Sequence, residues 1–119
     1  MDINKRDVLL LKKIHDNQEA LCSAMRELNI FAPTDLDRVH IMMRRGMVQT
    51  VADIFELTVP MSEDTAHQLP LNNAIIKQFR NTASHNYGQI TSVLAYACIV
   101  HCTDKQFMKK VEELIGYTK

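Results

Sequence analysis

The sequence predicts an all-α fold: a bundle of four or five helices in a single domain that spans residues 1–119. Three observations support this prediction. Apolar residues recur at steps of three, four or seven along almost the whole chain, which is the spacing of one helix face. No stretch alternates polar and apolar residues for long enough to suggest a sheet. The prolines stand between the helical stretches rather than inside them.

The first two predicted helices form the N-terminal half of the chain. The first covers residues 3–28, and its inward positions are Val8, Leu11, Ile14, Leu21, Met25 and Leu28. After Pro33, the pair Thr34 and Asp37 resembles a capping box, which predicts a second helix over residues 35–58. Gly46 lies inside this second stretch and weakens the prediction of one continuous rod.

The C-terminal half predicts a loop followed by three shorter helices. Residues 59–70 are polar, contain Pro60 and Pro70, and read as a loop. A helix should begin near Leu71 and turn Ile75, Ile76 and Phe79 inward. After Gly88, a strongly apolar helix is expected at the centre of the core, with Ile90, Val93, Leu94, Ala97 and Val100 forming its apolar face. Thr103 and Gln106 form a second capping-box pair, which predicts a last helix that buries Phe107, Val111 and Leu114.

Composition sets limits on partners and location. Lys and Arg together number 14, as do Asp and Glu, so any contact with nucleic acid must come from a local patch. The N-terminal residues M-D-I-N-K-R-D carry charges where a secretory signal needs an apolar run, and no stretch approaches the roughly 20 apolar residues of a membrane span. Three cysteines without a disulfide-like spacing fit a reducing compartment. We therefore expect a cytoplasmic protein that does not bind membranes.

The stretch R-N-T-A-S-H-N-Y, residues 80–87, places an arginine, a histidine and a tyrosine close together. On one ideal helix, Arg80 and His85 point about 140° apart, so a straight helix cannot aim both at one small target. Either the backbone breaks between them, or more than one copy of the chain builds the site.

These residue types suit metal-free cleavage of a phosphodiester. Arg80 can stabilise charge on phosphate oxygens, and His85 can move a proton to or from a ribose hydroxyl or leaving oxygen. Tyr87 could stack on a base or bind a phosphate. The alternative is that Arg80 and His85 simply form a solvated helix end, because arginine and histidine five residues apart often occur by chance.

The pattern R-x-x-x-x-H-x-Y, formed here by Arg80, His85 and Tyr87 with Asn81 after the arginine, resembles the motif of HEPN-domain toxins of the HepT type. The resemblance extends over nearly the whole chain. It includes D-V-L-L-L-K-K-I in the first helix, the turn F-A-P-T-D-L-D-R-V, and the L-P pair ten residues before the arginine. The tryptophan that often follows this L-P pair in the family is replaced here by Leu71.

The resemblance implies a homodimer whose Arg80 and His85 residues line a cleft at the two-fold axis. It implies an endoribonuclease that needs neither metal nor cofactor and leaves a cyclic phosphate, with Asn81 and Tyr87 as substrate-binding residues. It also implies a partner antitoxin, a nucleotidyltransferase of the MntA type, which would silence the toxin by adenylylating Tyr87. A second hypothesis remains open: a catalytically silent helical adaptor that binds a nucleotidyltransferase or its substrate.

Other groups of residues are interpreted as structural. Cys98, His101 and Cys102 lie within about one helical turn, and three ligands on one turn make a poor zinc site, so the cysteines are expected to pack in the core. His15 and His40 are expected to face solvent. Asp53 and Glu56 form either a paired acidic site or the solvent-facing side of their helix, and Gln49, one turn before Asp53, favours the solvent-facing side. The arginine set, which consists of Arg38, Arg44 and Arg45, either flanks the cleft or is ordinary surface charge. The methionine set, which consists of Met42, Met43 and Met47, is expected in the core or in a dimer interface.

Overall fold

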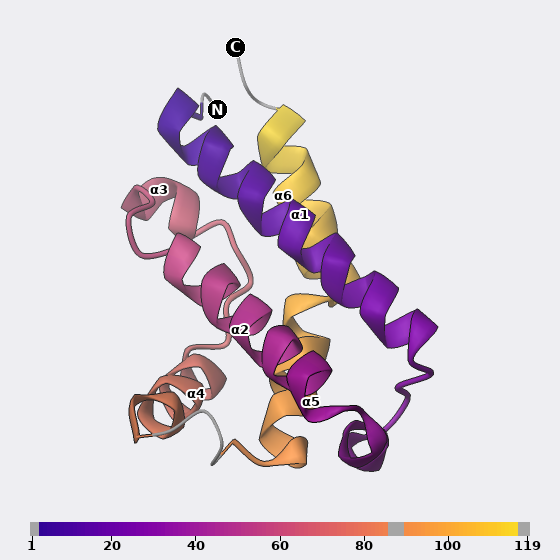
Figure 1. Ribbon diagram of the computed structural model, residues 1–119. Helices are drawn as coiled ribbons and strands as arrows, with labels where there is room; N and C mark the ends of the chain where they lie inside the picture. The colour runs from indigo at the N-terminus through magenta and orange to yellow at the C-terminus, as the bar shows by residue number, and fades with distance from the viewer. Residues whose placement is uncertain (1–2, 86–89, 117–119) are drawn as a thin grey trace.

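The computed structural model describes residues 3–85 and 90–116, which form helices and connections with no strand among them. The all-α prediction is therefore confirmed for this part of the chain. The helices, coloured along the chain in Figure 1, are α1 (Lys5–Glu27), the 3-10 helix η1 (Pro33–Arg38), α2 (Ile41–Leu57), α3 (Glu63–Ala66), α4 (Asn73–His85), α5 (Ser92–Cys102) and α6 (Lys105–Gly116).

The long helix α1 forms one side of the bundle and packs against α2 and α6 (Figure 1). The helix α5 lies across the other end, where it contacts η1, α2 and α4. The main-chain N–H of Asn72, just before α4, donates to Nε2 of His101 near the end of α5 at 3.1 Å. The start of α4 thus lies beside the end of α5. No described helix is long and apolar enough to cross a membrane.

The first helix begins and ends close to the predicted limits. Asn4 caps it, because its side-chain oxygen accepts the N–H of Asp7 at 2.8 Å. Val8, Leu11, Ile14 and Leu21 are buried as predicted, together with the polar Gln18, whose amide donates to the carbonyl of Cys102 at 2.9 Å.

The prediction of one helix over residues 35–58 is wrong, because the chain breaks at Val39 and His40. Both residues have extended backbone angles, with ψ of 137° and 136°. Before the break, the capping carboxylate belongs to Asp35 rather than to the Thr34 and Asp37 pair, and it accepts the N–H groups of Phe31 and Ala32 at 2.8 and 2.9 Å. After the break α2 continues through Gly46 without interruption. The predicted continuous helix therefore fails at a different place from the glycine.

The connection between α2 and α4 contains the one-turn helix α3, which the loop prediction for residues 59–70 missed. Asp7 of α1 is buried and holds this connection in place. Its carboxylate accepts the N–H of Ser62 at 3.1 Å and the hydroxyl of Thr65 at 2.7 Å, as well as the hydroxyl of Ser62. The connection is thus anchored to α1 by residues 55 and 58 positions away in the sequence.

The helix α5 reaches the core, but its predicted inward face is only partly right. Ile90 and Leu94 are buried as predicted, whereas Val93 is 67% exposed and Val100 is 43% exposed. The buried residues of α5 are Leu94, Ala95, Cys98, Ile99 and Cys102. Because α5 is apolar on nearly every side, its periodicity did not show which face packs inward. The exposed Val93 and Val100, with the half-buried Ala97 between them, form an apolar stripe.

The last helix α6 is capped by Asp104 rather than by the predicted Thr103 and Gln106 pair. The Asp104 carboxylate accepts the N–H groups of Gln106 and Phe107 at 2.9 and 3.3 Å. The hydroxyl of Thr103 instead bonds back to the carbonyl of Ile99 at 2.8 Å, which closes α5.

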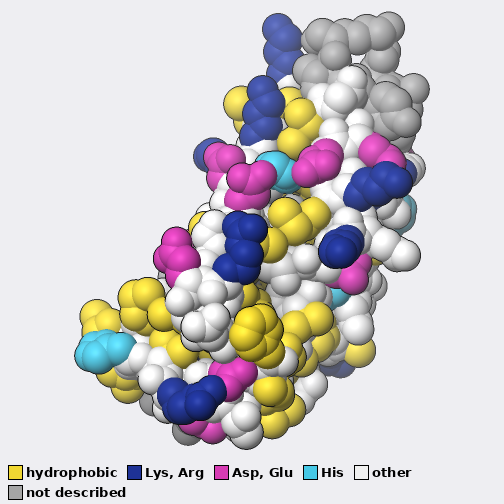
Figure 2. Space-filling view, turned by 90° about the vertical axis from the view of Figure 1, so that its right-hand side faces the viewer, with side chains coloured by type: hydrophobic (Ala, Val, Ile, Leu, Met, Phe, Trp, Pro, Cys, Tyr) yellow, Lys and Arg dark blue, Asp and Glu magenta, His cyan; other side chains and the backbone are white. Residues whose placement is uncertain are grey.

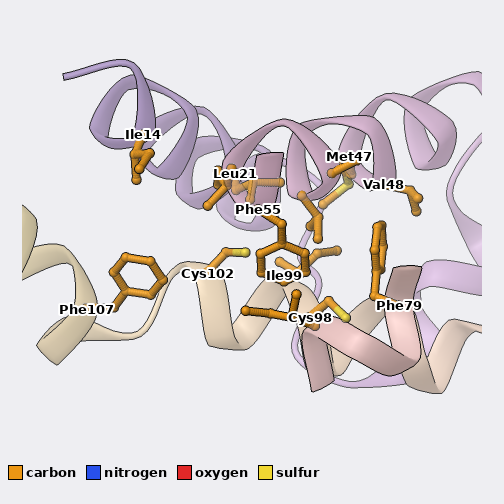
Figure 3. Close-up of a cluster of buried hydrophobic side chains, with 14 of the residues drawn as sticks. Ile14, Leu21, Met47, Val48, Phe55, Phe79, Cys98, Ile99, Cys102 and Phe107 are labelled. Atoms are coloured by element: carbon orange, nitrogen blue, oxygen red, sulfur yellow. The ribbon is translucent and has the colours of Figure 1, made fainter. Parts of the chain in front are cut away.

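The core is built around phenylalanines from three helices (Figure 3). Phe55 of α2 meets Phe79 of α4 edge to face, with ring centroids 5.4 Å apart, and Phe107 of α6 is fully buried. In α4, Ile76 and Phe79 point inward as predicted. The Phe55–Phe79 contact fixes α4 against the last turns of α2, which positions the candidate functional site.

Candidate functional site

Arg80 lies on α4, one residue after the buried Phe79, and reaches the C-terminal end of α2. Its Nη2 atom donates to the main-chain carbonyl oxygen of Phe55 at 3.3 Å, and its Nε atom lies 3.4 Å from Oε1 of Glu56. The side chain remains 44% exposed. Arg80 is therefore held at one edge by α2 while part of its surface stays accessible to a ligand.

The end of α2 suits a cation. Carbonyl groups in the last turn of a helix lack intrahelical partners, and the helix dipole places partial negative charge there. The Phe55 carbonyl also accepts the hydroxyl of Thr58 at 2.7 Å. Arg80 thus completes the capping of α2 in addition to any role toward a substrate.

A hollow of about 250 Å³ opens beside Arg80, between α2 and α4. Its floor is apolar, because the buried rings of Phe55 and Phe79 line it. Its polar lining groups come from Glu56, Arg80 and Ser84, and Ala52 and Ala83 complete it. A small planar or sugar-like group bound to a phosphate on Arg80 would find apolar surface and hydrogen-bonding groups here.

The other predicted site residues are only partly described. Asn81 is exposed, and its main-chain carbonyl accepts the hydroxyl of Ser84 at 2.9 Å. His85 is the last residue of α4, and its side chain lies outside the described part of the structure. Tyr87 lies in the segment 86–89, which is also outside the described residues.

The sequence left two arrangements open for Arg80 and His85: a break in the backbone between them, or a site built from more than one copy of the chain. The backbone excludes the first. The helix α4 runs without a break through both Arg80 and His85. The two positions therefore differ by about 140° around the helix axis, as an ideal helix requires. A break in the backbone does not bring them together, so a site that uses both residues on one small target needs a second copy of the chain.

The cysteines and His101 have structural roles. Burial raises the pKa of the Cys98 thiol to about 12 and also raises the pKa of Cys102, so neither supplies the thiolate that metals and electrophiles require. Burial lowers the pKa of His101, and the nearby Asp104 opposes this effect. The imidazole ring of His101 packs between Phe55 and Phe107. Within residues 3–85 and 90–116, no group of three His, Cys, Asp or Glu side chains could hold a metal ion.

Two histidines differ in their surroundings. His40 is exposed as predicted, and its Nδ1 accepts the N–H of Met42 at 3.2 Å, which caps α2. His15 was expected to face solvent, but its side chain is only 20% exposed and its Nε2 lies 2.9 Å from Oε1 of Glu112 on α6. His15 thus helps to join α1 to α6, a contact between residues 97 positions apart that helix periodicity cannot show.

Asp53 and Glu56 lie on the exposed side of α2, as predicted. Both border a second hollow, of about 460 Å³, between α1 and the end of α2. Asp53 accepts the side-chain amide of Gln49 at 3.0 Å, one turn earlier. Glu56 borders both hollows and so lies between this acidic surface and Arg80.

The arginine set lies at the opposite end of α2 from Arg80. Arg38 pairs with Asp35, and Arg44 lies 3.9 Å from Asp37. Eleven residues separate Arg45 from Glu56, which is about 16 Å along a helix. Within one chain these arginines do not flank Arg80.

The methionine set divides between core and surface. Met47 is buried, whereas Met42 and Met43 are 65% and 49% exposed. Figure 2 shows apolar side chains gathered toward the lower part of one face of the molecule, with charged side chains of both signs above them. An apolar groove of about 300 Å³ lies between α1 and α2 and includes Met42, Met43 and Gly46.

Sequence reasoning missed the contacts that hold Arg80. Glu56 and Phe55 precede it by 24 and 25 residues, and no local pattern links them to it. The packing of Phe79 on Phe55 brings the two helix segments together.

Known proteins supply no assignment for this site. In comparisons with models of protein families, with curated proteins and with solved structures, the chain has no significant match.

Proposed function

We propose that the protein is a metal-independent endoribonuclease toxin of a toxin–antitoxin pair, with a HEPN-like fold and a site built from Arg80 and His85 of two copies. The observation that carries the proposal is that one unbroken helix holds both residues, with the Arg80 guanidinium anchored at one edge and accessible at the other. The sequence pattern R-N-x-x-x-H-x-Y, which resembles the motif of HEPN-domain toxins, supports it.

The proposed reaction uses only groups that the chain supplies. The ribose 2′-hydroxyl attacks the adjacent phosphorus, the bond from phosphorus to the 5′-oxygen breaks, and a 2′,3′-cyclic phosphate remains. A His85 side chain takes the proton of the attacking hydroxyl or donates one to the leaving oxygen. Arg80 stabilises the negative charge that grows on the phosphate oxygens. Asn81 and Tyr87 are proposed to contact the substrate.

The proposal requires a homodimer. Because Arg80 and His85 diverge around α4, a two-fold axis must bring a second pair into the same cleft. The apolar stripe of the exposed Val93 and Val100 and the half-buried Ala97 offers a surface for such a contact. It lies on α5, which packs against α4.

Cleavage of RNA by the purified protein in excess chelator tests the activity. We expect Arg80→Ala and His85→Ala each to lose at least about a hundredfold in cleavage rate while keeping their helical content. Arg45→Ala is the matched control, because Arg45 is an exposed arginine at the far end of α2. Undiminished cleavage in both variants would assign the activity to another site.

Control by a partner is proposed at Tyr87. A nucleotidyltransferase of the MntA type would add a nucleotide monophosphate to its hydroxyl, two residues beyond His85. The added negative charge and bulk would repel and block the RNA phosphate. Tyr87→Phe should then keep most of its cleavage activity, because the hydroxyl has no assigned role in proton transfer, but escape neutralisation when the partner is co-expressed. Equal rescue of wild type and Tyr87→Phe would indicate inhibition by simple binding instead.

One observation favours a second candidate, a catalytically silent helical adaptor. The contacts of Arg80 with the end of α2 are those of a helix-capping arginine and need no substrate. An adaptor would leave RNA intact in the chelator assay. Loss of stability rather than of activity would then be the effect of Arg80→Ala.

A further inference from the structure

The Arg80 guanidinium uses one of its two hydrogen-bonding edges for contacts inside the protein. Nε and Nη2 form one edge of the guanidinium plane, and Nη1 and Nη2 form the other. In the structure Nη2 donates to the carbonyl oxygen of Phe55 at 3.3 Å, and Nε lies 3.4 Å from Oε1 of Glu56 in an ion pair. Both nitrogen atoms belong to the first edge. The second edge is the one left for a bidentate contact with a phosphate.

We infer that Glu56, together with the main-chain carbonyl of Phe55, is a positioning group that orients the second edge of Arg80 toward the substrate phosphate. This inference rests on the proposed function for the identity of the ligand. Glu56 itself touches Arg80 and not the reacting atoms. Its effect on the reaction is therefore carried through the guanidinium.

The two acceptors have complementary roles. The Phe55 carbonyl is fixed, because the Phe55 ring is buried and Thr58 bonds to the same oxygen. This oxygen also accepts the hydroxyl of Thr58 at 2.7 Å and its N–H at 3.3 Å, so it marks the position of Nη2 but holds it only weakly. The Glu56 carboxylate adds an ion pair at Nε, which draws the guanidinium toward the end of α2. A flexible arginine that is held in this way needs less ordering when a phosphate binds.

Asp53 provides a matched control for charge. It is also an exposed carboxylate on α2, three residues before Glu56, and it borders the same acidic hollow. Its hydrogen bond goes to Gln49 rather than to Arg80. Removal of either carboxylate changes the net charge by the same amount, so only a positional effect separates the two variants.

The first arm of the test reads the Arg80 contact directly, without RNA. In nitrogen-15 NMR spectra of the full chain, we expect a resolved Arg80 Nε–H signal whose chemical shift reports the nearby carboxylate. Glu56→Ala and Glu56→Gln both remove the charge beside Nε and should shift this signal, while Asp53→Ala should leave it near the wild-type position. An unchanged signal in Glu56→Ala would overturn the inference.

The second arm measures cleavage of an RNA oligonucleotide by the same four proteins in excess chelator. We expect Glu56→Ala and Glu56→Gln, which both remove the charge beside Nε, to lower kcat about threefold with a smaller change in KM. Asp53→Ala should match the wild type. Equal losses in Glu56→Ala and Asp53→Ala would overturn the inference in favour of a general charge effect. If the wild type cuts no RNA, the proposed function fails, and the chemical shift of the Arg80 signal decides separately whether Glu56 positions Arg80.

Discussion

Asp7 joins two parts of the chain that lie far apart in the sequence. Burial alone would raise the pKa of its carboxyl, but hydrogen bonds from Ser62, Thr65 and Asn4 outweigh this effect and lower the pKa overall. A carboxyl whose pKa is lowered in the folded state stabilises the protein above its unfolded pKa of about 3.9. This stabilisation disappears as the pH falls through the lower, folded value.

We therefore expect Asp7→Asn to lower the free energy of unfolding by about 1–3 kcal/mol at pH 7, because Asn cannot accept all of these hydrogen bonds. The difference from the wild type should shrink as the pH falls below about 4. Urea denaturation at several pH values measures it. The control is Asp16→Asn, an exposed carboxylate on the same helix, which should cost little. Equal stability of the two variants would show that the network does not stabilise the fold.

Residues of this kind mark the limit of sequence-based prediction. The chemistry of Arg80 and His85 could be proposed from residue types and spacing. The roles of Asp7 and Glu56 could not, because their partners are 55 and 24 residues away, respectively, and become neighbours only after the helices pack. A carboxylate on a helix reads the same in the sequence whether it is solvated or holds an arginine.

At the scale of elements, helical periodicity predicted which stretches form helices better than it predicted their ends. The first helix, α4 and α6 fall close to their predicted ranges. Errors occurred where a side chain competes for capping: Asp35 caps the start of a separate 3-10 helix, and Asp104 replaces the predicted cap of α6. The inward face of α5 was only partly right, because an apolar helix gives no direction by periodicity.

Gly46 is a position at which the helix α2 can be stabilised. It lies within α2, and a Cβ atom added there would have no neighbour within 4 Å. Gly46→Ala should raise the free energy of unfolding by about 0.5–1 kcal/mol, because alanine loses less conformational freedom in a helix. Thermal unfolding monitored by circular dichroism measures this change. A lower melting temperature would mean that α2 needs the glycine, for example for a close approach at the apolar groove that it borders.

At the scale of the whole molecule, the described chain has extents of 44, 30 and 20 Å and exposes several large apolar side chains. Two of its apolar surfaces are the stripe on α5 and the start of α2, where Ile41, Met42 and Met43 are exposed. The stripe is the better candidate for the proposed dimer. It lies on α5, which packs against α4, the helix that carries Arg80 and His85.

Light scattering should therefore show a dimer for the wild type at micromolar concentration and a monomer for the double variant Val93→Glu and Val100→Glu. Two buried charges in the interface would each cost more than the contact gains. Leu9→Glu is the control, since Leu9 is 61% exposed on α1, outside the stripe. A double variant that remains dimeric would place the interface on another surface, and a monomeric wild type would contradict the dimer itself.

The most direct test of the shared site is complementation between two inactive variants. Arg80→Ala and His85→Ala are mixed so that subunits exchange, and RNA cleavage in excess chelator is measured. A mixed dimer retains one Arg80 and one His85 on opposite subunits, so one of its two shared sites is intact. Because random pairing makes about half of the dimers mixed, we predict about a quarter of the wild-type activity. Arg80→Ala mixed with the double variant Arg80→Ala and His85→Ala, which supplies no arginine, should stay inactive. If the wild type cuts RNA but the first mixture cuts no better than either variant alone, the site is not shared between two copies.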